Sequence, residues 1–267
     1  IGILSVQELM TTPLAYALLS TLIVSLISLI GIFIFSKHDR LIKKSMHVFI
    51  GLAAGALLGD AFIHLIPEVF EAGLSGALFA GAVLSGIVLF FFLEKYLRWY
   101  NKTNHHKVCP PGEVCVVSNK KPLGLLVLFG DGVHNFIDGG IIAASYFVSI
   151  PVGIATTVAV FLHEVPQEVS DYALLLHSGY TRAEALFWNF ISAITAFLGI
   201  FAFLALGDRI ESIEPIAIAL TAGGFIYIAA ANLVPELQKT HHPVKSAVEF
   251  IAVIVGIGIM FALLLVE

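Results

Sequence analysis

The chain has 267 residues, of which 58% are hydrophobic and only 12% are charged, against the roughly 25% charged residues of soluble domains. This composition leaves no room for a soluble domain of useful size, and we expect no nucleic-acid partner. The formal net charge of −5 says little about partners, because the acidic and basic residues gather in different segments.

Eight apolar stretches follow one another along the chain, each about as long as the 20 residues that cross a bilayer. They cover residues 13–35, 47–69, 73–97, 123–148, 151–177, 183–206, 213–237 and 245–266. The first is too long and too poorly flanked to be a cleaved signal peptide. We therefore predict an all-α polytopic membrane protein with eight transmembrane helices, in which residues 1–267 form a single transmembrane domain.

The basic residues indicate how these helices are oriented. Lysine and arginine favour cytoplasmic loops, and 13 of the 14 fall within the alternate loops and helix ends at 36–46, 94–122, 178–183 and 238–246. Only Arg209 lies elsewhere, whereas the opposite ends carry acidic residues such as Glu68, Glu71 and Glu214. This pattern predicts that both termini lie on the non-cytoplasmic side of a plasma or organelle membrane.

The second and seventh stretches contain similar segments. GALLGDAFIHLIPE at 55–68 aligns without gaps with GGFIYIAAANLVPE at 223–236. The predicted topology runs these segments in opposite directions, as expected for an inverted repeat with a binding site between its halves. We therefore expect spans 1–3 and 6–8 to be repeats around spans 4 and 5. The alternative is two proline-terminated helices of similar composition.

Polar residues in these two segments are candidates for an ion pathway. Asp60 and His64 are one helical turn apart in the second stretch, and Glu68 follows at its outer end. Asn232 and Glu236 are their counterparts in the seventh stretch. A packing role for His64, or a helix-end position for either glutamate, remains an alternative.

Residues 98–122 form the only long connection and are predicted to face the cytoplasm. This loop contains His105, His106, Cys109 and Cys115, which could receive or sense a metal. A cytoplasmic location predicts reduced thiols rather than a disulfide. The C-x5-C spacing is not that of a zinc ribbon, and a flexible loop with weak metal affinity is the favoured interpretation.

The fourth and fifth stretches carry two polar clusters in otherwise apolar surroundings. The first reads His134-Asn135-x-x-Asp138 and the second His163-Glu164-x-x-Gln167-Glu168. Ionisable residues within spanning helices cost a few kcal/mol each and almost always face the protein interior or a water-filled path. Two such clusters on consecutive helices predict a polar site near the middle of the membrane.

Helical spacing arranges these side chains in rows. His134 and Asp138 share a face, with Asp131 a turn earlier. On the next helix, His163, Gln167 and Asp171 form one row, and Glu164 and Glu168 form the row beside it. A short turn near residues 149–151 would make the two helices antiparallel neighbours, and His177 would lie near the cytoplasmic end. Imidazole and carboxylate ligands suit zinc and other divalent first-row ions.

The paired motifs GDGVHNFIDG and HEVPQE, in eight spans, resemble those of the ZIP family of divalent-metal transporters. HLIPE in the second span and NLVPE in the seventh also fit the family pattern, so the resemblance covers the whole chain. It implies a primary metal site at His134, Asp138, His163 and Gln167. It also implies a second site at Asn135 and Glu164 with Asp138 shared, metal flow toward the cytosol by an elevator-like or rocking motion, and a homodimer.

The chain departs from the family subgroup it resembles most closely, His-Glu-x-Pro-His-Glu, at Gln167. An amide oxygen is a weaker zinc ligand than imidazole and shifts the preference modestly toward harder ions. We expect Zn²⁺ as the transported substrate, with Cd²⁺, Fe²⁺ or Mn²⁺ as alternatives, and no cofactor.

Two other classes of protein share some of these features. An intramembrane zinc-dependent protease or hydrolase would need His-Glu-x-x-His, but the second histidine position is Gln167. A proton-coupled solute carrier could use intramembrane carboxylates, but it would not need paired histidine and acid clusters on facing helices.

Overall fold

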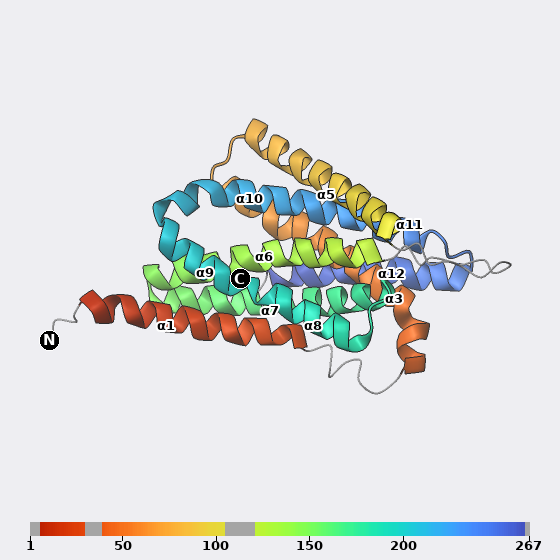
Figure 1. Cartoon of the computed structure of the whole chain (residues 1–267), viewed down its shortest axis with the longest axis horizontal. Helices are drawn as coiled ribbons and strands as arrows, with labels where there is room; N and C mark the ends of the chain where they lie inside the picture. Colours follow the sequence, from red (N-terminus) through yellow and green to blue (C-terminus); the bar gives the residue numbers. More distant parts are fainter. Residues whose placement is uncertain (1–5, 30–38, 105–120, 265–267) are drawn as a thin grey trace.

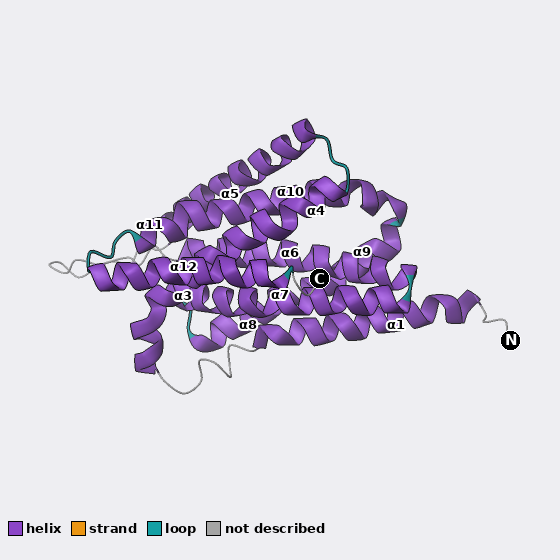
Figure 2. Cartoon of the chain, turned by 180° about the vertical axis from the view of Figure 1, so that it is seen from behind, coloured by secondary structure: helices purple, strands orange, loops and turns teal. Residues whose placement is uncertain are grey.

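The computed structural model describes the backbone of residues 6–29, 39–104 and 121–264, and the side chains of residues 12–29, 45–100, 122–207 and 213–264. Within these ranges the chain forms helices and no strand. The helices lie side by side in one elongated bundle, joined mostly by short connections (Figures 1 and 2). The prediction of an all-α protein is confirmed for this part of the chain.

The bounds of the elements follow the apolar stretches closely. The longer helices are α1 (Val6–Ser25), α3 (Asp39–Gly59), α5 (Gly76–Asn104), α6 (Lys121–Val148), α7 (Ile150–His177), α8 (Arg182–Ala193), α9 (Thr195–Leu206), α10 (Asp208–Tyr227) and α12 (Pro243–Leu263). The shorter elements are η1 (Leu26–Leu29), η2 (Asp60–Leu65), α4 (Ile66–Glu71), η3 (Ile228–Leu233) and α11 (Val234–Leu237).

Seven segments of the described chain are helical, long and apolar enough to cross a membrane. They are Thr12–Leu29, Ser45–Glu71, Gly76–Tyr100, Pro122–Val148, Arg182–Leu206, Ile213–Leu237 and Pro243–Leu263. They correspond to seven of the eight predicted spans. The remaining predicted span, 151–177, is α7, which has the same 28-residue length as α6. Its cluster of polar side chains makes it less apolar, so its place as an eighth span stays a prediction.

Local sequence signals set the turns on either side of α7. Ser149 alone separates α6 from α7, and its hydroxyl caps α7 by accepting a hydrogen bond from the Val152 N–H at 3.3 Å. At the other end, Gly179 adopts a φ of 90°, a conformation that side chains disfavour. Thr181 and Glu184 then form a capping box at the start of α8. The short connection at 149–151 predicted that α6 and α7 are neighbours, which is confirmed, and α8 also packs against α7.

The helices associate in two groups. In one group, α3 packs against α12 and α5 packs against α10. In the other, α6 packs against α7 and α9, and α1 lies against α6 and α7. A cluster of buried apolar residues from α3, α5, α6 and α10, which includes Phe90, Leu126 and Phe225, joins the two groups. The polar clusters of α6 and α7 lie close to this junction.

The two segments identified as a repeat have the same local structure. Each contains a π-helical segment, η2 at Asp60–Leu65 and η3 at Ile228–Leu233, and these fall at identical positions of the gap-free alignment. A proline, Pro67 or Pro235, follows two residues after each segment. Proline has no N–H to donate to the preceding turn, and in both copies that turn is widened. Such bulges are frequent at functional sites.

Close helix contacts also recur at equivalent places in the two segments. A Cβ on Gly55 would collide with the carbonyl oxygen of Val253 in α12, and a Cβ on Gly223 would collide with that of Val83 in α5. Only glycine allows the backbones to approach so closely. The α3–α12 and α10–α5 pairs are therefore built alike.

Helix ends predicted to be cytoplasmic gather at one end of the bundle. The C-terminal end of α5, the turn between α7 and α8, and the connection from α11 to α12 all lie toward the right-hand end in Figure 1. The start of α1 lies at the opposite end. The helix ends that are rich in basic residues therefore lie together at one end of the bundle.

Candidate metal site

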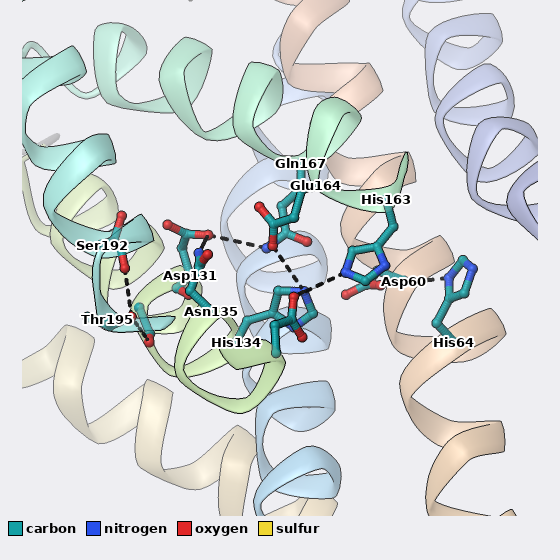
Figure 3. Close-up of polar contacts among 12 residues, drawn as sticks. Asp60, His64, Asp131, His134, Asn135, His163, Glu164, Gln167, Ser192 and Thr195 are labelled. Atoms are coloured by element: carbon teal, nitrogen blue, oxygen red, sulfur yellow. Dashed lines mark hydrogen bonds and ion pairs between the residues drawn. The ribbon is translucent and has the colours of Figure 1, made fainter. Parts of the chain in front are cut away.

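Side chains from α6 and α7 meet in a cluster, called here the central cluster, made of His134, Asp138, His163 and Glu164. Helical spacing places the first pair on one face of α6, and the second pair lies at adjacent positions of α7. One potential ligand atom from each of these residues lies within 4.8 Å of the others. The sticks in Figure 3 show both imidazoles and Glu164 pointing into the same space between the helices.

Distances within the central cluster are those of groups that could share one ion. His163 Nε2 lies 3.3 Å from Asp138 Oδ2, and His134 Nε2 lies 3.6 Å from the same oxygen. His134 Nε2 is also 3.7 Å from Glu164 Oε1. Two imidazole nitrogens and two carboxylates form a ligand set that suits zinc and related divalent ions.

The charge of the surrounding region also favours a cation. Asp131, Asp138, Glu164, Glu168 and Asp171 are all buried. In the part of the chain that the structure describes, none of the five forms a salt bridge with a lysine or arginine. Burying carboxylates without a permanently charged partner is expensive, so this region is suited to bind positive charge.

A second acidic cluster adjoins the first and shares Glu164 with it. Asp131, Glu164 and Glu168 each place one oxygen within 4.8 Å of the others. Asp131 Oδ1 accepts hydrogen bonds from Asn135 Nδ2 at 2.9 Å and from Gln167 Nε2 at 3.3 Å. Its other oxygen, Oδ2, is buried without a hydrogen-bond partner. The second cluster therefore has buried oxygen atoms that a cation could use.

Polar residues of α8 and the start of α9 lie against this second cluster on the side away from the central cluster. The Asn189 amide donates a short hydrogen bond to the Glu168 carboxylate. Ser192 and Thr195, which Figure 3 shows near Asp131, follow Asn189 at intervals of three residues. The Thr195 hydroxyl donates to the Gly132 carbonyl at 2.5 Å. The sequence analysis did not identify these residues, although three polar side chains at a spacing of three in the sixth apolar stretch were the available signal.

A cavity of about 280 Å³ leads to the central cluster from the end of the bundle at which α4 lies. His134, Asp138 and His163 form its floor, and Asp60, His64, Glu68 and Glu71 line its wall. His64 Nδ1 lies 3.7 Å from Asp60 Oδ1, and the His64 ring is 6.2 Å from that of His163. The candidate pathway residues of the second span thus line an approach to the cluster.

A separate cavity of about 300 Å³, called here the vestibule, lies at the other end of the bundle. It is lined by Arg98, Leu123, His177, Ala231, Asn232, Pro235, Glu236 and Lys239. His177 Nε2 lies 3.5 Å from Glu236 Oε1. Asp60, Gln167 and Asp171 border a narrow space that has no room for a water molecule. This narrow space lies beside the clusters and extends neither cavity.

The arrangement differs in two respects from the one that the family resemblance implied. The geometry includes Glu164 in the central cluster, and Glu164 rather than Asp138 is shared by the two clusters. Asn135 and Gln167 both donate to Asp131, while the Gln167 Oε1 atom is buried without a hydrogen-bond partner. His105, His106, Cys109 and Cys115 lie outside the described residues.

Comparison with known proteins gives a consistent family. The profile of the ZIP zinc transporter family matches residues 11–122 and 112–264. The zinc transporter ZIP13 homolog of Drosophila melanogaster is 28% identical over 93% of this chain and 88% of its own length. Zinc transporter ZIP4 of Rattus norvegicus is 31% identical over 84% of this chain, and zinc transporter SLC39A7 of Mus musculus is 28% identical over 92%. The matched region is only 43% of the rat protein.

Proposed function

The chain belongs to the ZIP zinc transporter family, and on that premise we propose that it carries divalent metal ions across a membrane toward the cytosol. Zinc is the first candidate substrate, with cadmium, iron and manganese as alternatives. The homologues are named as zinc transporters. The direction of transport follows from the family resemblance and from the distribution of basic residues between the two ends.

The central cluster is the observation that carries this proposal. It combines His134, Asp138, His163 and Glu164 within 4.8 Å, and an external cavity reaches it. A purely structural role would not require several buried carboxylates without a lysine or arginine partner, because hydrogen-bonded neutral groups could join the helices at lower cost. A mobile divalent cation would offset this charge.

Gln167 does not favour the protease alternative. The zinc hydrolase motif needs a histidine there, and the Gln167 amide nitrogen donates to Asp131. Two imidazoles contact one carboxylate oxygen of Asp138. A proton-coupled carrier of organic solutes would not need this arrangement. The ion-transport proposal accounts for both observations.

We propose that α7 is an eighth span and that the end of the bundle containing the vestibule faces the cytoplasm. The 28 residues of α7 are sufficient to cross a bilayer. Its polar side chains face α6 and α8, which removes the main objection to placing it in lipid. An even number of spans would leave both termini on the non-cytoplasmic side.

An inverted repeat would explain how the site is exposed alternately to the two sides. The matching π-helical segments and the matching glycine contacts support repeats made of spans 1–3 and 6–8. We propose that α1 and α6–α9 move together relative to α3, α5, α10 and α12, carrying the ion with them. The cavity at the central cluster and the separate vestibule fit a state open to the outer side.

A second ion could bind beside the first. We propose Asp131, Glu164 and Glu168 as the acidic ligands of that ion, with Gln167 contributing its amide oxygen. The Asn135 side chain would act indirectly here, because its amide nitrogen is bound to Asp131. Two divalent ions sharing Glu164 would neutralise most of the buried negative charge.

The function is tested by metal uptake into proteoliposomes that contain the purified protein. Saturable zinc uptake by the wild-type chain, lost in His163→Ala, is the expected result. His241→Ala is the matched control because His241 is exposed and distant in sequence from the clusters. Metal binding without flux in the wild-type protein would contradict transport. Equal uptake by wild type and His163→Ala would contradict the site.

The homodimer implied by the resemblance is a further prediction. The mass of the protein in detergent, measured by light scattering with correction for bound detergent, should correspond to two chains of 28.7 kDa. A mass of one chain at all protein concentrations would contradict it.

A further inference from the structure

Glu94 is a buried carboxylate on α5 that belongs to neither metal cluster. One of its oxygens, Oε1, contacts Arg98 Nε at 2.6 Å and Arg98 Nη2 at 2.5 Å. Its other oxygen, Oε2, accepts hydrogen bonds from the Tyr227 hydroxyl and the Asn232 amide nitrogen, each at 2.9 Å. A single side chain therefore connects α5 with the end of α10 and with η3. These contacts hold the carboxylate in one position.

The partners of Glu94 lie on the wall of the vestibule. Arg98 and Asn232 both line this cavity, together with His177, Glu236 and Lys239. The Arg98 side chain is 46% exposed, whereas that of Glu94 is 8% exposed. The guanidinium therefore faces the cavity while its counter-charge lies behind it.

The fixed charges around the vestibule are matched in pairs. Lys239 Nζ lies 2.5 Å from Glu236 Oε2, and Arg98 is paired with Glu94. A divalent ion passing an unpaired arginine would be repelled, and the repulsion would be substantial in a confined space of reduced dielectric constant. Pairing with Glu94 cancels most of that repulsion.

Glu94 also determines which atom Asn232 offers to the cavity. In a planar amide the nitrogen and oxygen point in different directions from the same carbon. Because the Asn232 nitrogen is bound to Glu94, the amide oxygen is the atom left for the vestibule. An amide oxygen in the vestibule can coordinate a cation, whereas the N–H groups of an amide nitrogen would repel one.

We propose that Glu94 is a positioning residue for passage of the ion through the vestibule: it neutralises Arg98 and orients the Asn232 amide. This inference rests on the proposed transport function, because it concerns the same ion after it leaves the central cluster. Glu94 itself does not contact the ion. Its effect should fall on the rate of release and not on binding at the central cluster.

The test compares four proteins in the same proteoliposome assay: wild type, Glu94→Gln, Arg98→Gln and the double variant. Glu94→Gln should lower the maximal zinc uptake rate about tenfold with an unchanged KM, which corresponds to about 1.4 kcal/mol added to the release barrier. Arg98→Gln should transport faster than Glu94→Gln, because it leaves no unpaired arginine on the wall of the vestibule. The double variant should recover at least half of the wild-type rate, because it no longer has an unpaired arginine.

Lys95→Gln is the matched control. Lys95 is the next residue on α5, is exposed and lies over the Phe91 ring rather than in the vestibule. The Lys95→Gln variant loses one positive charge at the neighbouring position of α5. It should transport like the wild type. Circular dichroism and thermal unfolding of each variant should verify that the fold is retained.

The dependence of the uptake rate on salt concentration is a second measurement. A purely structural role of Glu94 would not affect it. Raising the ionic strength from about 0.05 M to about 0.5 M shortens the screening length, so it should narrow the gap between Glu94→Gln and the wild type. A double variant as slow as Glu94→Gln would overturn the proposal, as would a wild-type rate in Glu94→Gln. Absence of flux in the wild-type protein would instead contradict the transport function itself.

Discussion

The segments 60–68 and 228–236 have the same backbone structure but differ in several side chains. Both form a π-helical segment followed by a short helix with an early proline. In the first segment, Asp60, His64 and Glu68 line the cavity that leads to the central cluster. In the second, the aligned residues are Ile228, Asn232 and Glu236, of which Asn232 and Glu236 line the vestibule.

The side-chain differences between the two segments could explain how two similar halves transport an ion in one direction. Carboxylate and imidazole groups in the cavity beside α4, on the side proposed to be outer, would attract and partly dehydrate a divalent ion. An amide held by Glu94 and a glutamate shared with Lys239 and His177 would bind the ion less strongly. In the proposed transporter, the two segments would line separate pathways, and their side chains would make one suited to capture and the other to release.

The largest effect should come from the central cluster, which the cavity beside α4 reaches. Asp138→Asn keeps the size of the side chain but removes a charge that faces both histidines. Uptake of zinc into proteoliposomes should fall at least about a hundredfold, which corresponds to a loss of about 2.7 kcal/mol of ion binding. Near-normal uptake would show that the two pathways meet elsewhere.

The equivalence of the two backbones predicts equal losses of stability. Gly55→Ala and Gly223→Ala would each push a Cβ into a carbonyl group of the partner helix. Each should reduce the free energy of unfolding by about 2 kcal/mol, as other overpacked contacts do. Thermal unfolding in detergent would measure both.

Gly81→Ala and Gly258→Ala are the matched controls on α5 and α12, since a Cβ at either position meets nothing within 4 Å. These controls should be neutral or slightly stabilising, because alanine favours helix. A large loss in only one of the Gly55 and Gly223 variants would argue against equivalent packing.

Variants on the two sides should separate capture from release. Removing ligands of the outer cavity, as in His64→Gln combined with Asp60→Asn, should raise the KM for zinc about tenfold with little change in maximal rate. His177→Gln on the vestibule side should instead lower the maximal rate about fivefold at an unchanged KM. Initial rates measured over a range of zinc concentrations distinguish the two results. A change of KM in both variants would remove the proposed division of roles.

The smallest effect is expected at Gln167, whose amide nitrogen donates a hydrogen bond to Asp131 of the second cluster. Gln167→His would add an imidazole beside the second cluster and should increase the preference for zinc over manganese about threefold. Competition between the two ions in the uptake assay would measure this ratio. An unchanged ratio would show that position 167 does not bind the transported ion.

The sequence was sufficient to predict much of this arrangement. Apolar length identified the helices, and helical spacing placed His134 with Asp138 on one face of α6. The alignment of 55–68 with 223–236 pairs the residues of η2 with those of η3, although it did not predict that either segment is π-helical. These features depend on local sequence, on hydrophobicity or on internal similarity, which a single chain contains.

Contacts between distant helices could not be predicted in the same way. The pairing of Glu94 with Tyr227 and Asn232, and that of Asn189 with Glu168, depend on how each helix is rotated and tilted. The sharing of Glu164 by both clusters depends on the same relative placement of α6 and α7. Spacing along one helix does not determine these quantities, since they result from packing over the whole bundle.

Zinc X-ray absorption spectroscopy on the zinc-loaded protein in lipid nanodiscs would test the central claim most directly. The account predicts nitrogen and oxygen ligands at about 2.0–2.2 Å, as in other zinc sites, with imidazole scattering that decreases in His134→Ala and again in the His134→Ala, His163→Ala double variant. A spectrum dominated by sulfur at about 2.3 Å, or one unchanged in these variants, would contradict a central cluster that binds the ion.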